Sequence, residues 1–194
     1  METEKLKPVL EALFAASDKP LSVNQIFELF VGDIEQPDKD DIRKAIQELV
    51  AQYQHSGIEL KQVASGFRFQ VRAEFETWIT RLWEQKPPRY SRALMETLAL
   101  IAYRQPITRG EIEDIRGVSV STNMIKTLQE REWVKPLGHK DVPGRPTLYG
   151  TTKIFLDYFN LKSLNELPTL AEIRDLDQYH PEFAFGESSD VVAQ

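Results

Sequence analysis

The residue types that most often carry out catalysis are scarce in this chain of 194 residues. It contains no cysteine, which excludes a thiol nucleophile, a disulfide, an iron–sulfur cluster and a cysteine-ligated zinc site. Its three histidines, His55, His139 and His180, lie in different parts of the chain, and none has a second histidine within four residues. We interpret them as surface or loop residues and expect no catalytic histidine and no metal site.

Motifs that bind nucleotides are also missing. The sequence has no Gly-x-x-x-x-Gly-Lys-Ser/Thr phosphate loop and no Gly-x-Gly-x-x-Gly run after a strand. Glu111, Glu113 and Asp114 are close together, but on a short amphipathic helix they most simply form a solvated face. We therefore expect no enzymatic activity and no cofactor, which leaves protein binding and DNA binding as the classes of function to weigh.

Charge is distributed unevenly along the chain. The formal net charge is −6 in total, and it divides into −4 for residues 1–87, +3 for residues 88–168 and −5 for residues 169–194. No apolar run approaches the roughly 20 residues that span a bilayer. The first residues, Met1-Glu2-Thr3-Glu4, are acidic where a signal peptide is basic. We expect a cytoplasmic protein without a membrane segment, and its basic middle is the part best suited to phosphate contacts.

The first 87 residues show three helical patterns followed by an alternating one. The spacing of apolar residues predicts helices over 6–14, 23–30 and 42–53, the second capped by Ser22 and the third by Asp38 or Asp40. Period-two alternation over 58–62 and 67–71, joined at Ser65-Gly66, predicts a β-hairpin. Three helices and a hairpin form the plan of a winged-helix domain. A further helix is expected from Glu74 to Gln85.

The residues after Pro87-Pro88 repeat this plan. The proline pair cannot continue a helix and predicts the domain boundary. Three helices are expected to begin at Ser91, at Thr108 and at Ser119 or Ser121, and two strands, 133–137 and 147–149, flank a loop rich in glycine and proline. At an offset of 86, four residues have counterparts in the second half: Pro20, Ser22, Ile26 and Leu29 match Pro106, Thr108, Ile112 and Ile115. Ile42 aligns with Met124 at an offset of 82, so the first copy has about four extra residues in its turn.

We therefore predict a mainly α fold with small β-hairpins (α+β), made of two tandem winged-helix domains. They are an N-terminal domain, 1–87, and a C-terminal domain, 88–168, followed by an acidic tail, 169–194. A chance match of two common helical patterns is the alternative to a true repeat. The tail is poor in aliphatic residues and is expected to be flexible in isolation, and its Leu170, Ile173, Phe183 and Phe185 are candidates for docking on a partner.

The expected recognition helices are poorly equipped to read DNA. A helix–turn–helix places its second helix in the major groove. In the first domain that helix carries four acids beside only three cations, Lys39, Arg43 and Lys44. The second copy is better suited, and its candidates for a weak DNA contact are Lys126, Arg131 and, in the wing, Lys140. A tandem winged-helix transcription regulator is therefore the alternative interpretation rather than the preferred one.

Aromatic residues that a winged-helix plan does not need favour protein binding. Interface cores are rich in aromatics, and the chain has six such candidates: Trp78, Trp83, Tyr90, Tyr103, Trp133 and Phe159. The alternative is that they complete two small cores.

Four stretches of the second half carry a resemblance to a known family. They are Leu98 to Arg109 (LALIAYRQPITR), Ile115 to Val118 (IRGV), Gly138 to Thr152 (GHKDVPGRPTLYGTT), and Phe155 to Phe159 (FLDYF) with Leu161 to Leu164 (LKSL). The chain resembles segregation and condensation protein B (ScpB), the tandem winged-helix subunit of the bacterial SMC condensin. The long DVPGRPTLYGTT loop is the most specific of the four, and the first domain matches in architecture more than in motif.

The resemblance implies a non-catalytic subunit. It implies a homodimer formed largely through the N-terminal domains, binding to the kleisin ScpA, and contact with the SMC ATPase and with DNA through the complex. The expected role is chromosome condensation and segregation during cell division, by a cytoplasmic, nucleoid-associated protein.

Seven residues of the second domain are candidates for the partner surface or for ordering it: Tyr103, Arg104, Arg116, Trp133, His139, Arg145 and Tyr149. Gly144 lies between Pro143 and Arg145-Pro146, where the prolines fix φ and glycine permits the remaining turn. Such a stiff loop would hold Arg145 in a defined direction. The alternative is that Arg145 and Arg116 bind carbonyls and acids inside the domain.

Overall fold

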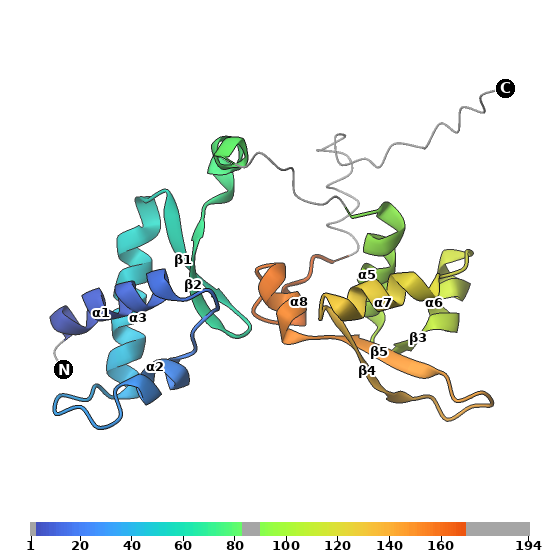
Figure 1. Cartoon of the computed structure of the whole chain (residues 1–194), viewed down its shortest axis with the longest axis horizontal. Helices are drawn as coiled ribbons and strands as arrows, with labels where there is room; N and C mark the ends of the chain where they lie inside the picture. The colour runs from blue at the N-terminus through green and yellow to red at the C-terminus, as the bar shows by residue number, and fades with distance from the viewer. Residues whose placement is uncertain (1–2, 83–89, 170–194) are drawn as a thin grey trace.

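The computed structural model describes residues 3–82 and 90–169 (Figure 1). Within these ranges no helix has the length and apolar character that a membrane span requires, and no group of three or more His, Asp or Glu side chains is arranged to hold a metal ion. Several predictions concern residues outside the described ranges: Trp83, Gln85, Pro87-Pro88, His180, Leu170, Ile173, Phe183 and Phe185.

The first domain has the predicted three helices and hairpin. Its elements are α1 (Thr3–Ala16), α2 (Val23–Leu29), α3 (Lys39–Gln52), a 3-10 turn (Tyr53–His55), β1 (Ile58–Val63) and β2 (Gly66–Val71). Capping boxes begin two of the helices, at Ser22 for α2 and at Asp38 for α3, which decides between the two predicted caps. The core is formed by apolar residues of α1, α2 and α3 together with Leu60 of β1.

The hairpin of the first domain is closed tightly against the start of α2. β1 and β2 pair antiparallel, with Lys61 opposite Arg68, and Leu21 bridges Phe67 on the other side of β2. Gly66 has a φ of 150°, and a Cβ placed there would lie 2.3 Å from the carbonyl oxygen of Leu21. Only glycine permits this close approach of the two backbones.

The segment after β2 differs from the prediction of one helix over 74–85. It consists of a 3-10 turn (Ala73–Phe75), α4 (Glu76–Ile79) and a second 3-10 turn (Thr80–Leu82). No side chain caps α4, and the side chains of Trp78 and Leu82 are 61% and 75% exposed. Because short helices are marginal unless an apolar face is packed, the segment forms short turns within its described part.

The second domain repeats the plan with its own core. Its elements are α5 (Arg92–Arg104), β3 (Ile107–Thr108), α6 (Arg109–Arg116), α7 (Thr122–Glu130), β4 (Val134–His139), β5 (Thr147–Thr151), α8 (Lys153–Tyr158) and a 3-10 turn (Leu164–Glu166). Side-chain caps begin α5 at Ser91, α6 at Thr108 and α7 at Ser121. The strands form an antiparallel sheet in the order β3-β5-β4. Together the two domains confirm the α+β tandem winged-helix fold (Figure 1).

The structure supports the internal repeat at residues that the sequence comparison did not use. At the offset of 86, Leu21 aligns with Ile107. Leu21 bridges Phe67 in β2, and Ile107 pairs with Tyr149 in β5, so both residues contact the second strand of their own wing. The connection from α2 to α3 spans residues 30–38, whereas that from α6 to α7 spans residues 117–121, which accounts for the four extra residues.

Candidate partner-binding surfaces

Trp133 is the centre of an aromatic cluster in the second core. It is 2% exposed, and its ring centroid lies 5.1 Å from that of Tyr90, 4.7 Å from that of Tyr158 and 5.5 Å from that of Phe159. Edge-to-face and tilted contacts at these distances add to the energy of apolar burial. The core alternative therefore holds for Trp133, and a buried ring makes no direct contact with a partner.

Arg131 closes the outer side of this cluster. Its guanidinium lies 4.6 Å from the ring centroid of Tyr90 and 5.5 Å from that of Trp133. It also donates a hydrogen bond of 2.8 Å to the Tyr90 hydroxyl. These contacts occupy the ring-facing side of the guanidinium and one of its donors, so the geometry speaks against Arg131 as a DNA contact.

Arg116 lies inside the domain rather than on its surface. Its side chain is 8% exposed and donates to Glu96 at 3.1 Å and to the Thr97 hydroxyl at 3.2 Å. Glu96 also accepts from Arg92, and these bonds lower the pKa of the Glu96 carboxyl. Arg116 therefore binds an acid of its own domain, as the alternative to a partner contact predicted, and it joins α6 to α5.

Lys140 binds Glu111 at the start of α6. Lys140 donates a hydrogen bond of 2.6 Å to Glu111, which also accepts from the Thr108 N–H and hydroxyl, both at 2.8 Å. The Lys140 ammonium and the two Thr108 donors lower the pKa of Glu111 to about 2. Arg104 and Glu111 line a shallow hollow of about 330 Å³. The wing is thus attached to the start of α6, and the charge of Lys140 is compensated.

His139, at the end of β4, and Arg145, in the wing loop, are both exposed. The loop is closed by two backbone hydrogen bonds of 2.9 Å, from the Lys140 N–H to the Pro146 carbonyl and from the Arg145 N–H to the Val142 carbonyl. Arg145 has a φ of 40°, in the left-handed region that non-glycine residues rarely adopt. The loop therefore fixes the backbone of Arg145, as the glycine and proline pattern predicted.

Tyr149 and Tyr103 lie in two other places. Tyr149 is half-buried in β5, between Ile107 and Pro136 on the neighbouring strands. Tyr103, at the end of α5, donates a hydrogen bond to the carbonyl of Pro168 and lines a hollow of about 490 Å³ beside residues 164–169. Two of the seven partner-surface candidates lie beside DNA candidates: the Trp133 ring lies 5.5 Å from the Arg131 guanidinium, and His139 precedes Lys140 in the chain. The seven residues do not form one cluster.

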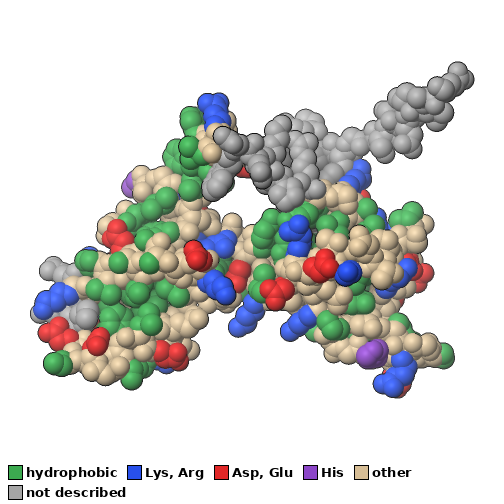
Figure 2. All heavy atoms as spheres, in the orientation of Figure 1, with side chains coloured by type: hydrophobic (Ala, Val, Ile, Leu, Met, Phe, Trp, Pro, Cys, Tyr) green, Lys and Arg blue, Asp and Glu red, His purple; other side chains and the backbone are tan. Residues whose placement is uncertain are grey.

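Several cations of the recognition helices already contact groups of their own domains. On α3, Arg43 pairs with Asp40, and the Lys39 ammonium lies 5.2 Å from the Phe27 ring centroid. On α7, Lys126 pairs with Glu130 at 3.5 Å. Figure 2 shows cations and acids interspersed over the visible face of the described residues, without a continuous basic stripe. Such a distribution is poorly suited to a duplex, whose affinity depends on neutralised phosphates.

The tip of the first wing contacts α8 of the second domain. The Ser65 N–H donates to the Asp157 carboxylate at 2.9 Å, and Arg68 donates to the Asp157 carbonyl at 2.9 Å and to the Asn160 side chain at 2.8 Å. Asp157 is 9% exposed, and Val63 is buried without belonging to either core cluster. The β1–β2 hairpin and α8 therefore form the junction between the domains (Figure 1).

Comparison with known proteins identifies the family. The family model described as "Segregation and condensation complex subunit ScpB" matches residues 8–170. The chain belongs to this family. It is therefore a subunit of the complex that segregates and condenses chromosomes, and this agrees with the resemblance carried by the loop over 138–152.

Individual ScpB proteins match over most of the chain. A segregation and condensation protein B homolog of Coxiella burnetii is 52% identical over 189 residues, which cover 97% of this chain and 88% of the relative. The crystal structure of ScpB from Mycobacterium tuberculosis is 30% identical, covers 83% of this chain and 98% of that one, and has a TM-score of 0.37. A dimer of the ScpB N-terminal domain complexed with a ScpA peptide is 24% identical, covers 41% of this chain and 96% of that one, and has a TM-score of 0.36.

Sequence reasoning did not find the residues that join the two domains of this ScpB chain. Asp157 falls in the family-like stretch over 155–159 and Asn160 directly follows it, but nothing in these residues shows which element faces them. The available signal was a single acid between apolar residues of a short helix, since a carboxylate that is buried needs hydrogen-bond donors. Arg68 gave no signal, because alternate polar residues are normal on a hairpin.

Proposed function

We propose that the chain is a non-catalytic, homodimeric subunit that binds a kleisin of the ScpA class and contacts the SMC ATPase and DNA through it. It acts in the cytoplasm, in association with the nucleoid. The observation that carries this proposal is the family match across both domains, combined with recognition helices in which Arg43, Lys126 and Arg131 are held by groups of the chain itself. Winged-helix domains whose recognition helices are poorly suited to phosphates remain available as protein-binding scaffolds.

The two domains are proposed to divide the work. Residues 1–87 form the homodimer and residues 88–168 bind the kleisin. The separate cores support testing the two halves as fragments, because each encloses its own buried apolar cluster.

The experiment is co-purification of the full chain, of residues 1–87 and of residues 88–168 with the kleisin of the same organism. We expect the full chain and the second fragment to retain the kleisin at micromolar concentration, and the first fragment to remain dimeric without it. Kleisin retained by residues 1–87 alone would overturn the assignment of roles. If the full chain fails to bind the kleisin and shifts a specific DNA fragment at physiological salt, the transcription regulator is the correct interpretation.

A further inference from the structure

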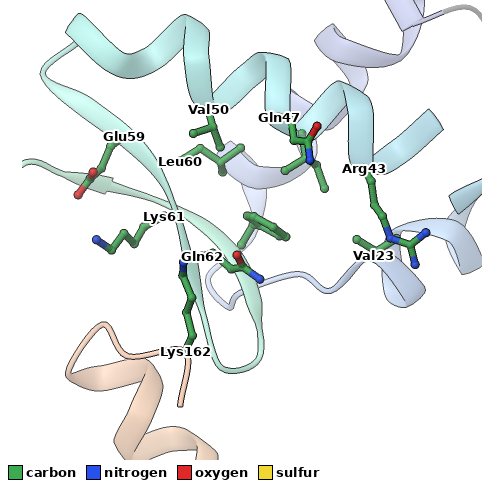
Figure 3. Close-up of a pocket in the computed structure, with 11 residues that line it drawn as sticks. Val23, Arg43, Gln47, Val50, Glu59, Leu60, Lys61, Gln62 and Lys162 are labelled. Carbon is green, nitrogen blue, oxygen red and sulfur yellow. The ribbon is translucent and has the colours of Figure 1, made fainter. Parts of the chain in front are cut away.

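A groove of about 640 Å³ runs along β1 at the junction of the two domains (Figure 3). Its floor is apolar and is formed by five residues of the first domain: Val23, Ile46, Val50, Leu60 and Phe67. Lys162, from the second domain, extends toward β1 near Gln62 (Figure 3). The groove therefore combines an apolar floor with polar walls from both domains.

The groove follows the edge of a strand. Four consecutive residues of β1, 59–62, line it, although neighbouring side chains in a strand point to opposite faces. Among the described residues, β1 pairs only with β2, and β2 is bridged on its other side by Leu21. The outer edge of β1 thus offers unpaired N–H and C=O groups, which another extended segment can bind by adding a strand.

The charges around the groove favour an acidic segment. Within the described part of the chain, neither Lys61 nor Lys162 has an ion-pair partner for its ammonium, and Lys61 lies opposite another cation, Arg68, in the hairpin. The acid of the groove, Glu59, already accepts from Gln70 at 2.8 Å and lies 3.8 Å from Arg72. Two uncompensated lysines therefore face the groove from the two domains.

The chain itself contains a segment of the matching chemistry. Residues 170–194 hold six acids and one arginine, and within them Glu182-Phe183-Ala184-Phe185 alternates with period two. Phe183 follows Lys162 by 21 residues, which span up to about 70 Å when extended and so set no limit on reaching the groove. A covalent connection also gives such a segment an effective concentration on the order of millimolar.

We propose that residues 182–185 of the same chain bind in this groove as a strand added to β1. Leu60 belongs to the first core, so the face of β1 that carries Leu60 is the floor side and the face that carries Lys61 is the opposite one. Phe183 and Phe185 then cover the floor, and Glu182, on the other face of the added strand, lies beside the lysines. The bound segment protects an edge strand that would otherwise pair with other chains.

Paramagnetic relaxation in the full chain tests the proposal, because the absence of cysteine allows a single nitroxide label to be attached. Ala51 is exposed and lies beside the groove, where it lines an adjoining hollow with Val50 and Leu60. A label at Ala51→Cys is expected to broaden the amide signals of residues 182–186. A label at Gln129→Cys, exposed on α7, is the matched control and is expected to leave them sharp. Full signal intensity with both labels would overturn the proposal.

Two further variants test the chemistry of the contact. Reversing Lys61 and Lys162 to Glu is expected to lower the docking equilibrium about threefold, the effect of losing the exposed contacts between the Glu182 carboxylate and the two lysines, whereas Lys126→Glu leaves it unchanged. Replacing Phe183 and Phe185 by Ser is expected to abolish the broadening. No effect of either change would contradict the assigned contacts.

A mixed sample distinguishes a contact within one chain from a contact between two. It contains two kinds of chain: one carries the nitroxide at position 51 without isotopes, and the other carries isotopes without the nitroxide. If the isotope-labelled signals broaden as strongly as when both labels are on one chain, the segment binds another copy and the proposal is overturned. Sharp signals support the proposal. None of these measurements involves a kleisin, so their outcome is independent of the proposed function.

Discussion

The junction between the domains depends on Arg68, and its removal should undock them. Arg68 donates two hydrogen bonds across the junction, at 2.9 Å and 2.8 Å, to the Asp157 carbonyl and the Asn160 side chain. Hydrogen bonds from a charged donor contribute about 1.5–3 kcal/mol. Lys61 lies opposite Arg68, so Arg68→Ala also removes a repulsion. The bond to Asn160 is exposed to solvent and adds little, so we expect the two bonds together to contribute about as much as one such bond, about 1.5–2 kcal/mol, which shifts the docked equilibrium about 10- to 30-fold.

Single-molecule energy transfer measures this equilibrium directly. Cysteines introduced at Ala15 and Gln129, both exposed and in different domains, carry the two dyes. The unsubstituted chain is expected to give one narrow distribution of transfer efficiency, and Arg68→Ala a broad one. Lys153→Ala, which removes an exposed cation from the same α8, is the control and is expected to retain the narrow distribution. A narrow distribution for Arg68→Ala at the efficiency of the unsubstituted chain would refute the reasoning.

Three further predictions follow from individual contacts. Trp133→Ala removes a buried ring and is expected to destabilise the second domain by about 3–5 kcal/mol without moving the urea transition of the first; equal shifts of both transitions would contradict separate cores. The pKa of Glu111 is lowered from 4.5 to about 2, so its contribution to stability is present above pH 4.5 and is lost as the pH falls toward 2. Glu111→Gln should therefore flatten the acid side of the stability profile between pH 4.5 and 2, and an unchanged profile would show that Lys140 does not stabilise the fold through this carboxylate. Gly66→Ala places a methyl group 2.3 Å from the Leu21 carbonyl oxygen and is expected to destabilise the first domain by more than about 1 kcal/mol. The shift of the urea midpoint of this domain measures the effect. An unchanged midpoint would show that the two backbones can separate freely.

Local signals were sufficient for most elements of the fold. Ser22, Ser91 and Thr108 were predicted as helix caps and each accepts a hydrogen bond from the third residue of its helix. The alternation around Ser65-Gly66 predicted the hairpin, because period two and a turn residue are both local features. Strand β3 was not predicted, since its two residues have no periodicity and exist as a strand only through pairing with β5.

The candidate surface was less accessible to sequence reasoning. Aromatic residues in a small domain fill its core or lie at its surface, and composition does not distinguish the two. Trp133 proved to be buried, whereas Trp78 is largely exposed. The partners of Arg116 and Arg68 lie 19 to 92 positions away in the sequence, so only the folded chain reveals them. The family motif identified the complex, and the structure supplied the contacts within the chain.

The mass of the complex in solution tests the central claim most directly. The full chain is mixed with the ScpA-class kleisin of its organism at micromolar concentration and physiological salt, and the mass is measured by light scattering during size-exclusion chromatography. We predict a single species that contains the kleisin together with two copies of this chain, and a mass of two copies when the kleisin is left out. A chain that elutes as a monomer, with the kleisin in a separate peak, would contradict the proposal that this ScpB family member is a homodimeric kleisin-binding subunit.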